Sequence, residues 1–160
     1  MSPARPILVA AAAATAVALL GTAATRLDGW YYGLHKPAWQ PPDWLFGPAW
    51  TLIYALAAFA GVRAWNRLHG NGPRRRLVLV LFGVNALLNV LWSELFFGLR
   101  RPDWALVEVV PFWLSILVLL LVLWPVSRAA GLALVPYLAW VAFAAALNLA
   151  ITRLNAPFAA

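Results

Sequence analysis

The stretch AAGLALVPYLAWVAFAAALNLAIT, residues 129–152, contains 24 consecutive uncharged residues between Arg128 and Arg153. A helix needs about 20 apolar residues to cross a hydrocarbon core of roughly 30 Å, so this stretch is long enough to span a membrane. Four further uncharged windows precede it, with lengths of 20, 19, 17 and 19 residues: 6–25, 44–62, 77–93 and 109–127. We therefore predict an all-α membrane protein, in which residues 1–160 form a single bundle of five transmembrane helices.

The overall composition supports this prediction. Of the 160 residues, 64% are hydrophobic and only 11% are charged, whereas soluble domains contain about 25% charged residues. A soluble domain of this size could not cover so much apolar surface with polar groups. Intrinsic disorder is excluded as well, because disordered segments are rich in charge and poor in aromatic residues.

The net charge of +7 would suggest a nucleic-acid partner in a soluble protein. Here the basic residues flank the apolar windows, where arginine faces lipid headgroups, so we predict a lipid bilayer and no nucleic acid as partner. Seven basic residues belong to the N-terminus and the second and fourth connections, against five on the other side, which favours a cytoplasmic N-terminus. The seven are Arg5, Arg63, Arg67, Arg74, Arg75, Arg76 and Arg128, and the five are Arg26, Lys36, Arg100, Arg101 and Arg153.

Metal and thiol chemistry find little support. The chain contains no cysteine, which excludes disulfides and thiolate metal ligands. His35 and His69 are too few and too far apart to indicate a metal site. We predict no metal and no obligatory cofactor.

The predicted helices cover approximately residues 6–26, 45–67, 77–99, 103–124 and 130–153. Prolines at positions 37, 41 and 42 break any helix within residues 27–44, which we predict to be one long loop. The later connections are short, so successive helices are expected to be antiparallel neighbours. The first helix resembles a signal peptide, but its apolar stretch is long for one, and we expect it to be retained.

Several helix faces stand out by their spacing. Small residues recur three or four apart in the first helix, which allows a neighbouring helix to pack closely; these are Ala10, Ala14, Ala18 and Gly21. In the third helix Asn85 and Asn89 share a face with Trp92 and Phe96. An asparagine in hydrocarbon needs a partner, so these amides and that of Asn148 should point inward. They form either interhelical hydrogen bonds or ligand contacts.

Two acidic residues lie within or next to the windows. Glu94 is near the end of the third helix and Glu108 is near the start of the fourth. An ionisable residue in a membrane is a candidate functional group. Both lie close to helix ends, however, and we expect them to pair with Arg100 or Arg101 at the membrane interface.

The ten tryptophans exceed what interfacial anchoring requires. Trp65, Trp104 and Trp124 lie at window ends, where tryptophan normally forms an interfacial belt. By contrast, four indoles fall within 21 residues between prolines, at positions 30, 39, 44 and 50. A proline-stiffened aromatic loop over the mouth of a bundle is suited to covering a flat apolar ligand, because rings stack with offset geometry.

At this loop the sequence resembles a known family. Residues 30–50, WYYGLHKPAWQPPDWLFGPAW, are similar to the signature of the translocator protein family, also called tryptophan-rich sensory protein or peripheral-type benzodiazepine receptor. Three more segments match in order: NVLW at 89–92 followed by FFGLR at 96–100, WALVE at 104–108, and PYLAWVAF at 136–143 continuing to Leu147 and Asn148. The resemblance covers about residues 30–155.

This resemblance implies a five-helix bundle that forms a homodimer, with a ligand pocket under the first loop. Members bind tetrapyrroles such as protoporphyrin IX and haem, synthetic isoquinolines and benzodiazepines, and in some cases cholesterol. The ligand-binding positions that it implies are Trp30, Tyr31, Trp39, Trp50, Asn89, Trp92, Trp140, Ala144 and Leu147.

Three functions remain open at this point. The first is a membrane receptor or transporter-like protein that binds tetrapyrroles, in a bacterial cell envelope membrane, with a regulatory or transport role. The second is an enzyme that breaks down bound porphyrin in light, with Trp50 and Trp140 exchanging electrons with the excited ring. The third is a structural membrane scaffold.

The chain departs from the family pattern at two positions. Leu149 stands where the cholesterol motif of animal members has an aromatic residue, although Arg153 remains. We therefore do not expect sterol recognition. Glu94 stands where many relatives have proline, so we expect the third helix to run straighter there.

Overall fold

A computed structural model describes residues 4–158 of the chain. Five long helices dominate this part of the chain, and each is long and apolar enough to cross a membrane. They are α1 (Ala4–Ala24), α3 (Phe46–Arg67), α4 (Gly72–Ser93), α5 (Pro102–Leu123) and α6 (Arg128–Asn155). The predicted all-α bundle of five spanning helices is confirmed.

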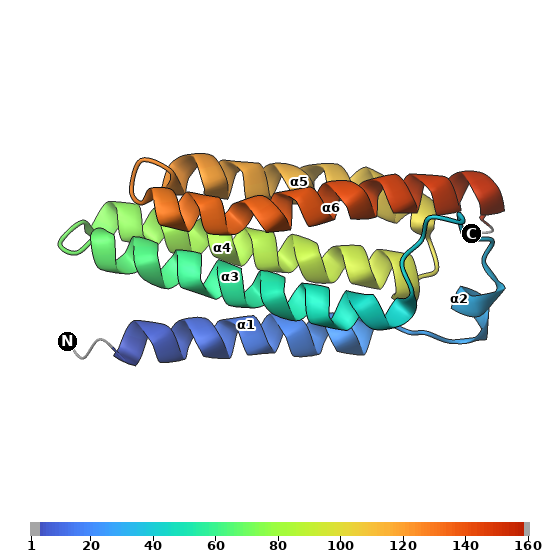
Figure 1. The fold of residues 1–160 in the computed structure, drawn as a ribbon, viewed down its shortest axis with the longest axis horizontal. Coiled ribbons are helices and arrows are strands. Elements are labelled where there is room, and N and C mark those ends of the chain that lie inside the picture. Colours follow the sequence, from blue (N-terminus) through green and yellow to red (C-terminus); the bar gives the residue numbers. More distant parts are fainter. Residues whose placement is uncertain (1–3, 159–160) are drawn as a thin grey trace.

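The helices follow one another around the bundle in the order α1, α3, α6, α5, α4. Consecutive long helices are antiparallel, as Figure 1 shows. A long loop joins α1 to α3, and short connections join the later pairs. The expectation that consecutive helices are also neighbours is wrong for α3 and α4, which touch only sparsely. The reason is that α3 packs mainly on α1 and α6, and these two helices occupy its flanks.

The two ends of the bundle carry different connections (Figure 1). We call one the loop end, because it holds residues 25–45 and the C-terminus of α6. We call the other the arginine end, because it holds the start of α1 and the α3–α4 and α5–α6 connections. The seven arginines that we assigned above to the N-terminus and the second and fourth connections all belong to the arginine end. None of the five acidic residues of the chain does.

Two boundaries differ from the prediction because of local capping. Helix α4 begins at Gly72, earlier than position 77, because the Asn71 side chain accepts a hydrogen bond from the Arg74 amide at 3.1 Å. Pro73 fits this first turn, where its missing N–H has no helical partner to lose. In the loop, a short helix α2 (Gly29–Gly33) forms because Asp28 Oδ1 accepts from the Trp30 and Tyr31 amides.

Proline does not interrupt the spanning helices. Pro111 lies inside the fourth predicted helix, where proline is expected to interrupt a helix, yet α5 continues through it. Helix α6 likewise continues through Pro136. Spanning helices tolerate proline because neighbouring groups satisfy the freed backbone carbonyls.

The C-terminal end of α4 is not straight, contrary to expectation. The chain widens into a π-helical turn η2 (Glu94–Gly98), closed by a hydrogen bond from the Leu99 amide to the Glu94 carbonyl at 2.8 Å. Such turns redirect side chains within a helix. Here the turn lies where Phe96 and Phe97 enter the bundle end.

The main core lies between α5, α6 and their neighbours. Its largest fully buried apolar side chains are Phe112, Ile116, Leu119, Leu123, Leu134 and Val141. Helix α1 contributes little to this core, since only Gly21 and Ala24 of its residues are buried. The outer faces of the bundle are apolar, as a lipid-embedded protein requires.

Candidate functional site

Aromatic rings converge at the loop end around the π turn. Trp92 stacks on Phe96, with ring centroids 5.3 Å apart and planes inclined by 27°. Trp30 from α2 meets the same Phe96 ring edge-on at 6.2 Å. Tyr31 contacts Phe97 at 5.7 Å. The loop thus rests its own rings on those of α4 and η2.

A second group of rings extends this arrangement to α6. Trp140 contacts Phe46 at 5.8 Å and Phe143 at 5.6 Å, and Trp39 from the loop meets Phe143 edge-on at 5.8 Å. The buried Leu147 belongs to the core under both groups. We refer to both groups as the aromatic cluster, composed of Trp30, Tyr31, Trp39, Phe46, Trp92, Phe96, Phe97, Trp140 and Phe143.

Trp50 lies next to the cluster. Its ring stacks on Tyr54 at 5.4 Å with an angle of 27°, and meets Tyr137 edge-on at 6.1 Å. Trp50, Trp92 and Trp140 come from α3, α4 and α6, and all three pack against the main core. Three partly buried indoles from three helices therefore border the same core.

A chain of hydrogen bonds crosses the bundle below these rings. The Tyr54 hydroxyl donates to Asn89 Oδ1 at 3.0 Å, and Asn89 Nδ2 donates to the Tyr137 hydroxyl at 3.2 Å. Tyr137 in turn donates to Asn85 Oδ1 at 3.1 Å, and Asn85 Nδ2 donates to Ser115 Oγ at 2.9 Å. The expected inward orientation of Asn85 and Asn89 is confirmed, and their amides join four helices.

Asn148 is also buried, at 1% exposure. With its amide oriented to satisfy both of its polar atoms, Nδ2 donates to the Pro102 carbonyl at 2.9 Å and Oδ1 accepts from the Leu106 amide at 3.1 Å. It therefore binds α6 to the first turn of α5, and the interhelical alternative holds for this residue.

A few polar links hold the loop on the bundle. Arg100 forms an ion pair with Asp28 at 2.9 Å, and Asn155 Nδ2 donates to the His35 carbonyl at 2.8 Å. Within the loop, the Tyr31 hydroxyl donates to Asp43 at 2.8 Å.

These surroundings shift two pKa values. The pKa of Tyr31 is raised, first because burial disfavours the phenolate and then because of the Asp43 carboxylate. The pKa of Asp28 is lowered, chiefly by the hydrogen bond from the Tyr31 amide and also by Arg100.

A cavity of about 570 Å³ lies elsewhere, between α1, α3 and α4. Its walls run from Tyr54, Asn85 and Tyr137 at the inner end to Arg5 and Trp65 at the arginine end. None of the nine predicted ligand-binding residues lines it. The predicted small face of α1 does line it, through Ala10 and Ala14, and so do Tyr54, Ala57 and Gly61 of α3.

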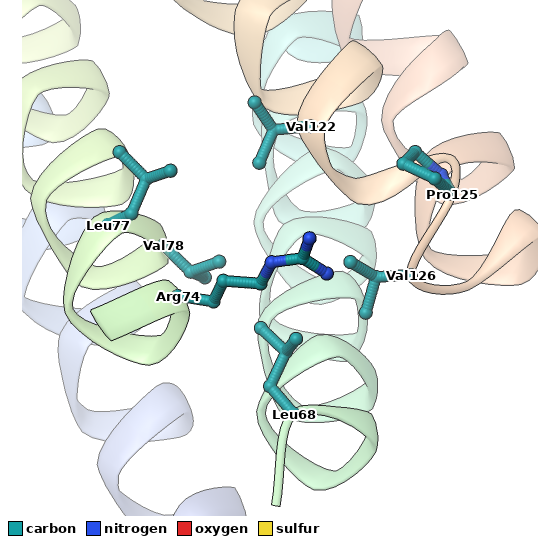
Figure 2. Close-up of a pocket in the computed structure, with 7 residues that line it drawn as sticks. All are labelled: Leu68, Arg74, Leu77, Val78, Val122, Pro125 and Val126. Carbon is teal, nitrogen blue, oxygen red and sulfur yellow. The ribbon is translucent and has the colours of Figure 1, made fainter. Parts of the chain in front are cut away.

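A smaller cavity of about 240 Å³ lies at the arginine end between α4 and the α5–α6 connection. Figure 2 shows Arg74 reaching across it from α4 toward Val126. Val78 lines both cavities, so α4 separates them at this level. Sequence reasoning missed both, and it assigned Trp65 to interfacial anchoring alone.

The nine predicted residues are thus divided among neighbouring environments. Trp30, Tyr31, Trp39, Trp92 and Trp140 join the aromatic cluster, Trp50 lies next to it, and Asn89 belongs to the hydrogen-bond chain. Leu147 is buried and Ala144 is half-buried one turn from Trp140. Trp44, in contrast, is 71% exposed and lies outside the cluster.

The two glutamates do not pair as expected. Arg100 pairs with Asp28, and Arg101 pairs with Asp103 in the first turn of α5, so neither arginine is left for them. Glu94 is exposed. Glu108 is only 8% exposed, and neither carboxyl oxygen has a hydrogen-bond partner in the described part of the chain. Its position in α5 is six residues after Pro102, about 9 Å along the helix axis.

No group of three or more potential metal ligands occurs among residues 4–158.

Comparison with known proteins assigns the family. A family model described as the TspO/MBR family matches residues 7–154. The tryptophan-rich protein TspO of Chlorobaculum tepidum is 42% identical over 130 residues, which cover 79% of this chain and 80% of the relative. The tryptophan-rich sensory protein of Cereibacter sphaeroides is 37% identical over 128 residues, covering 80% and 78%. The human translocator protein is 36% identical over 126 residues, covering 79% and 75%. With its five spanning helices and its tryptophan-rich loop folded over their ends, the chain belongs to the TspO/MBR family of membrane proteins.

Proposed function

We propose that this membrane protein binds a tetrapyrrole, protoporphyrin IX or haem, among the rings of the aromatic cluster and Trp50, and that binding serves a regulatory or transport role. The observation that carries the proposal is that Trp50, Trp92 and Trp140, from three helices, all pack against the main core, while Trp92 also packs against the smaller core that contains Tyr31 of the loop. Aromatic faces at this depth favour a large flat ring, because offset stacking and burial of apolar area both contribute to its affinity.

The charges at the loop end suit the acidic groups of such a ligand. Lys36 Nζ lies 3.6 Å from the centroid of the Tyr31 ring and forms no ion pair within residues 4–158. The Arg100 guanidinium lies 5.9 Å from the Trp30 centroid. A tetrapyrrole carries its carboxylates along one edge, so its rings can enter the cluster while that edge remains near Lys36.

Entry of a large ring requires the loop to move, because the loop rings Trp30, Tyr31 and Trp39 now pack on the helix and π-turn rings Phe96, Phe97 and Phe143. The loop is fixed by an exposed ion pair and a small number of hydrogen bonds, and surface ion pairs contribute little to stability. We therefore propose that residues 25–45 lift as one lid, with α2 carrying Trp30 and Tyr31 away from Phe96 and Phe97.

Titration of the purified protein in detergent with protoporphyrin IX tests the proposal. We expect tryptophan quenching and a Soret shift, and about fivefold weaker binding for Trp140→Leu, since loss of one stacking partner costs about 1 kcal/mol. Trp104→Leu is the matched control, because Trp104 is 50% exposed and lies outside the cluster. Absence of a Soret shift, or equal loss in both variants, contradicts binding at this site.

The same complex separates the remaining functions. If light-dependent breakdown occurs, illumination bleaches the Soret band faster in the parent protein than in the Trp50→Phe, Trp140→Phe double variant. Equal bleaching rates in the two proteins would mean that Trp50 and Trp140 bind the porphyrin without taking part in its breakdown. A flux assay in sealed vesicles then distinguishes a transporter from a receptor, because only a transporter carries the porphyrin across the bilayer.

A further inference from the structure

We propose that the cavity between α1, α3 and α4 is a second binding site, which holds one acyl chain of an anionic phospholipid with its phosphate next to Arg5. This site is separate from the aromatic cluster, since the cavity lies toward the opposite end of the bundle and shares none of the cluster residues. The occupant comes from the membrane leaflet that faces the arginine end.

The walls of the cavity match a narrow flexible chain. Small side chains line it from two sides: Ala10, Ala13 and Ala14 on α1, and Ala57, Ala58 and Gly61 on α3. From Arg5 to Val17 the cavity follows α1 for about 18 Å, at 1.5 Å per residue. One leaflet contributes about half of a hydrocarbon core of roughly 30 Å, so the cavity has the length of a lipid tail.

The cavity opens toward lipid on its flank. Val9 on α1 and Leu79 on α4 both line it, and they are 61% and 55% exposed. In Figure 1 helices α1 and α3 draw apart toward the start of α1, whereas Gly21 at the other end lies close enough for a β carbon to meet the Tyr54 hydroxyl at 3.7 Å. A tail can therefore enter sideways from the bilayer without passing through water.

Charge determines which way the lipid lies. Arg5 lines the mouth, is exposed and forms no ion pair in the described part of the chain. The arginine end around it holds seven arginines and no acidic residue, so its potential attracts an anionic headgroup. At the inner end, the hydroxyl hydrogens of Tyr54 and Tyr137 are already donated to Asn89 and Asn85. The apolar tail thus belongs inside and the phosphate belongs at Arg5.

The experiment measures lipid retention by the full-length protein. The protein is reconstituted with equal amounts of phosphatidylglycerol and phosphatidylcholine, extracted in mild detergent and analysed by native mass spectrometry. We expect one phosphatidylglycerol molecule to remain bound under conditions that remove phosphatidylcholine. Equal retention of the two lipids overturns the proposal.

Two pairs of variants locate the site. Ala57→Leu fills the cavity and should abolish retention, while Ala55→Leu on the exposed side of the same helix should preserve it. Arg5→Gln should weaken the preference for phosphatidylglycerol about fivefold, because one basic residue near an anionic headgroup contributes about 1 kcal/mol. Arg74→Gln removes the same charge from the smaller cavity and should leave retention unchanged.

Retention by Ala57→Leu as strong as by Ala55→Leu overturns the assignment to this cavity. A second copy of the chain is the other possible occupant. Because the chain has no cysteine, Ala13→Cys introduces a single thiol on the cavity wall, and disulfide formation there reports contact with a second copy. If this variant forms a disulfide-linked dimer that retains no lipid, a neighbouring protomer covers the cavity and the lipid proposal is wrong.

Discussion

At the loop end, large rings pack against one another beneath a loop that contributes rings of its own. At the arginine end, alanine and glycine on α1 and α3 leave a cavity of about 570 Å³. The aromatic side chains belong to the segments that carry the family signature, whereas α1, which forms one wall of the cavity, precedes that signature. The contrast is between one end of the bundle that is filled by aromatic rings and another that is lined by small residues and leaves a cavity.

The largest difference between the two ends should appear in unfolding. Phe96→Ala removes a ring that is 3% exposed and contacts Trp30, Trp92 and Phe97, so it leaves a cavity in a filled region. We expect the free energy of unfolding to fall by about 3 kcal/mol, the lower part of the usual range, because unfolded helices remain in lipid.

The matched change at the arginine end is Val78→Ala. Val78 is equally buried but borders two existing cavities, so its methyl groups contact fewer neighbouring atoms. Their removal therefore loses less packing energy. We expect a loss of about 1 kcal/mol. Detergent-induced unfolding followed by circular dichroism measures both, and equal losses would remove the packing difference between the ends.

Glu108 lies between the two regions and supplies a second test. Both carboxyl oxygens lack partners among the described residues, and a buried unsatisfied polar group costs about 1–3 kcal/mol. We expect Glu108→Leu to raise the free energy of unfolding by about 2 kcal/mol. Glu108→Gln, which keeps the polar group and the shape, should change it little. Destabilisation by both substitutions would mean that the carboxyl itself has a native partner.

The hydrogen-bond chain joins the two regions, and Tyr137 is its centre. Tyr137→Phe leaves Asn89 Nδ2 without its acceptor and Asn85 Oδ1 without its donor. We expect a loss of about 1 kcal/mol in unfolding free energy, because hydrogen bonds between spanning helices are individually modest.

Tyr54→Phe removes only the first link of this chain and should cost about half as much. Tyr32→Phe changes an exposed ring outside the chain and serves as the control. A larger effect for Tyr54 than for Tyr137 would contradict the order of the chain.

The smallest effect concerns the lid. Asp28→Asn keeps a residue that can cap α2 but loses the ion pair with Arg100, so amide exchange in residues 29–33 should rise slightly. Asp28→Ala loses both contacts and should raise exchange further. Unchanged exchange in Asp28→Ala would show that Asp28 does not hold the lid.

The pH dependence of lid closure follows from the same carboxyl. The pKa of Asp28 is lowered below its ordinary value of 3.8 in the folded protein, so its contribution is complete above that value. The contribution is lost as the pH falls through the lowered pKa. The protection factors of the amides in residues 29–33, which correct for the intrinsic pH dependence of exchange, should therefore stay constant from neutral pH down to about pH 4 and fall only below it. A fall near about pH 6 would point to another group.

The sequence predicts the spanning helices well because their signal is composition over a long window. It predicts their ends less well, because single residues decide them: Asn71 caps α4 early, and Asp28 starts a helix inside the loop. It also predicts the inward faces of Asn85 and Asn89, since an amide at membrane depth needs a hydrogen-bond partner. The partners themselves lie on other helices, at distances along the chain that no local pattern reveals.

By itself, the sequence determined that this chain crosses a membrane five times and carries a tryptophan-rich loop between its first two spans. Hydrocarbon thickness and the cost of unpaired backbone groups leave no other arrangement for such windows. The tertiary structure decided which helices are neighbours, how the π turn brings Phe96 under Trp30, and that the Glu108 carboxyl has no hydrogen-bond partner within residues 4–158. It alone also placed the alanines of α1 opposite those of α3, because an empty volume exists only between surfaces that meet in space.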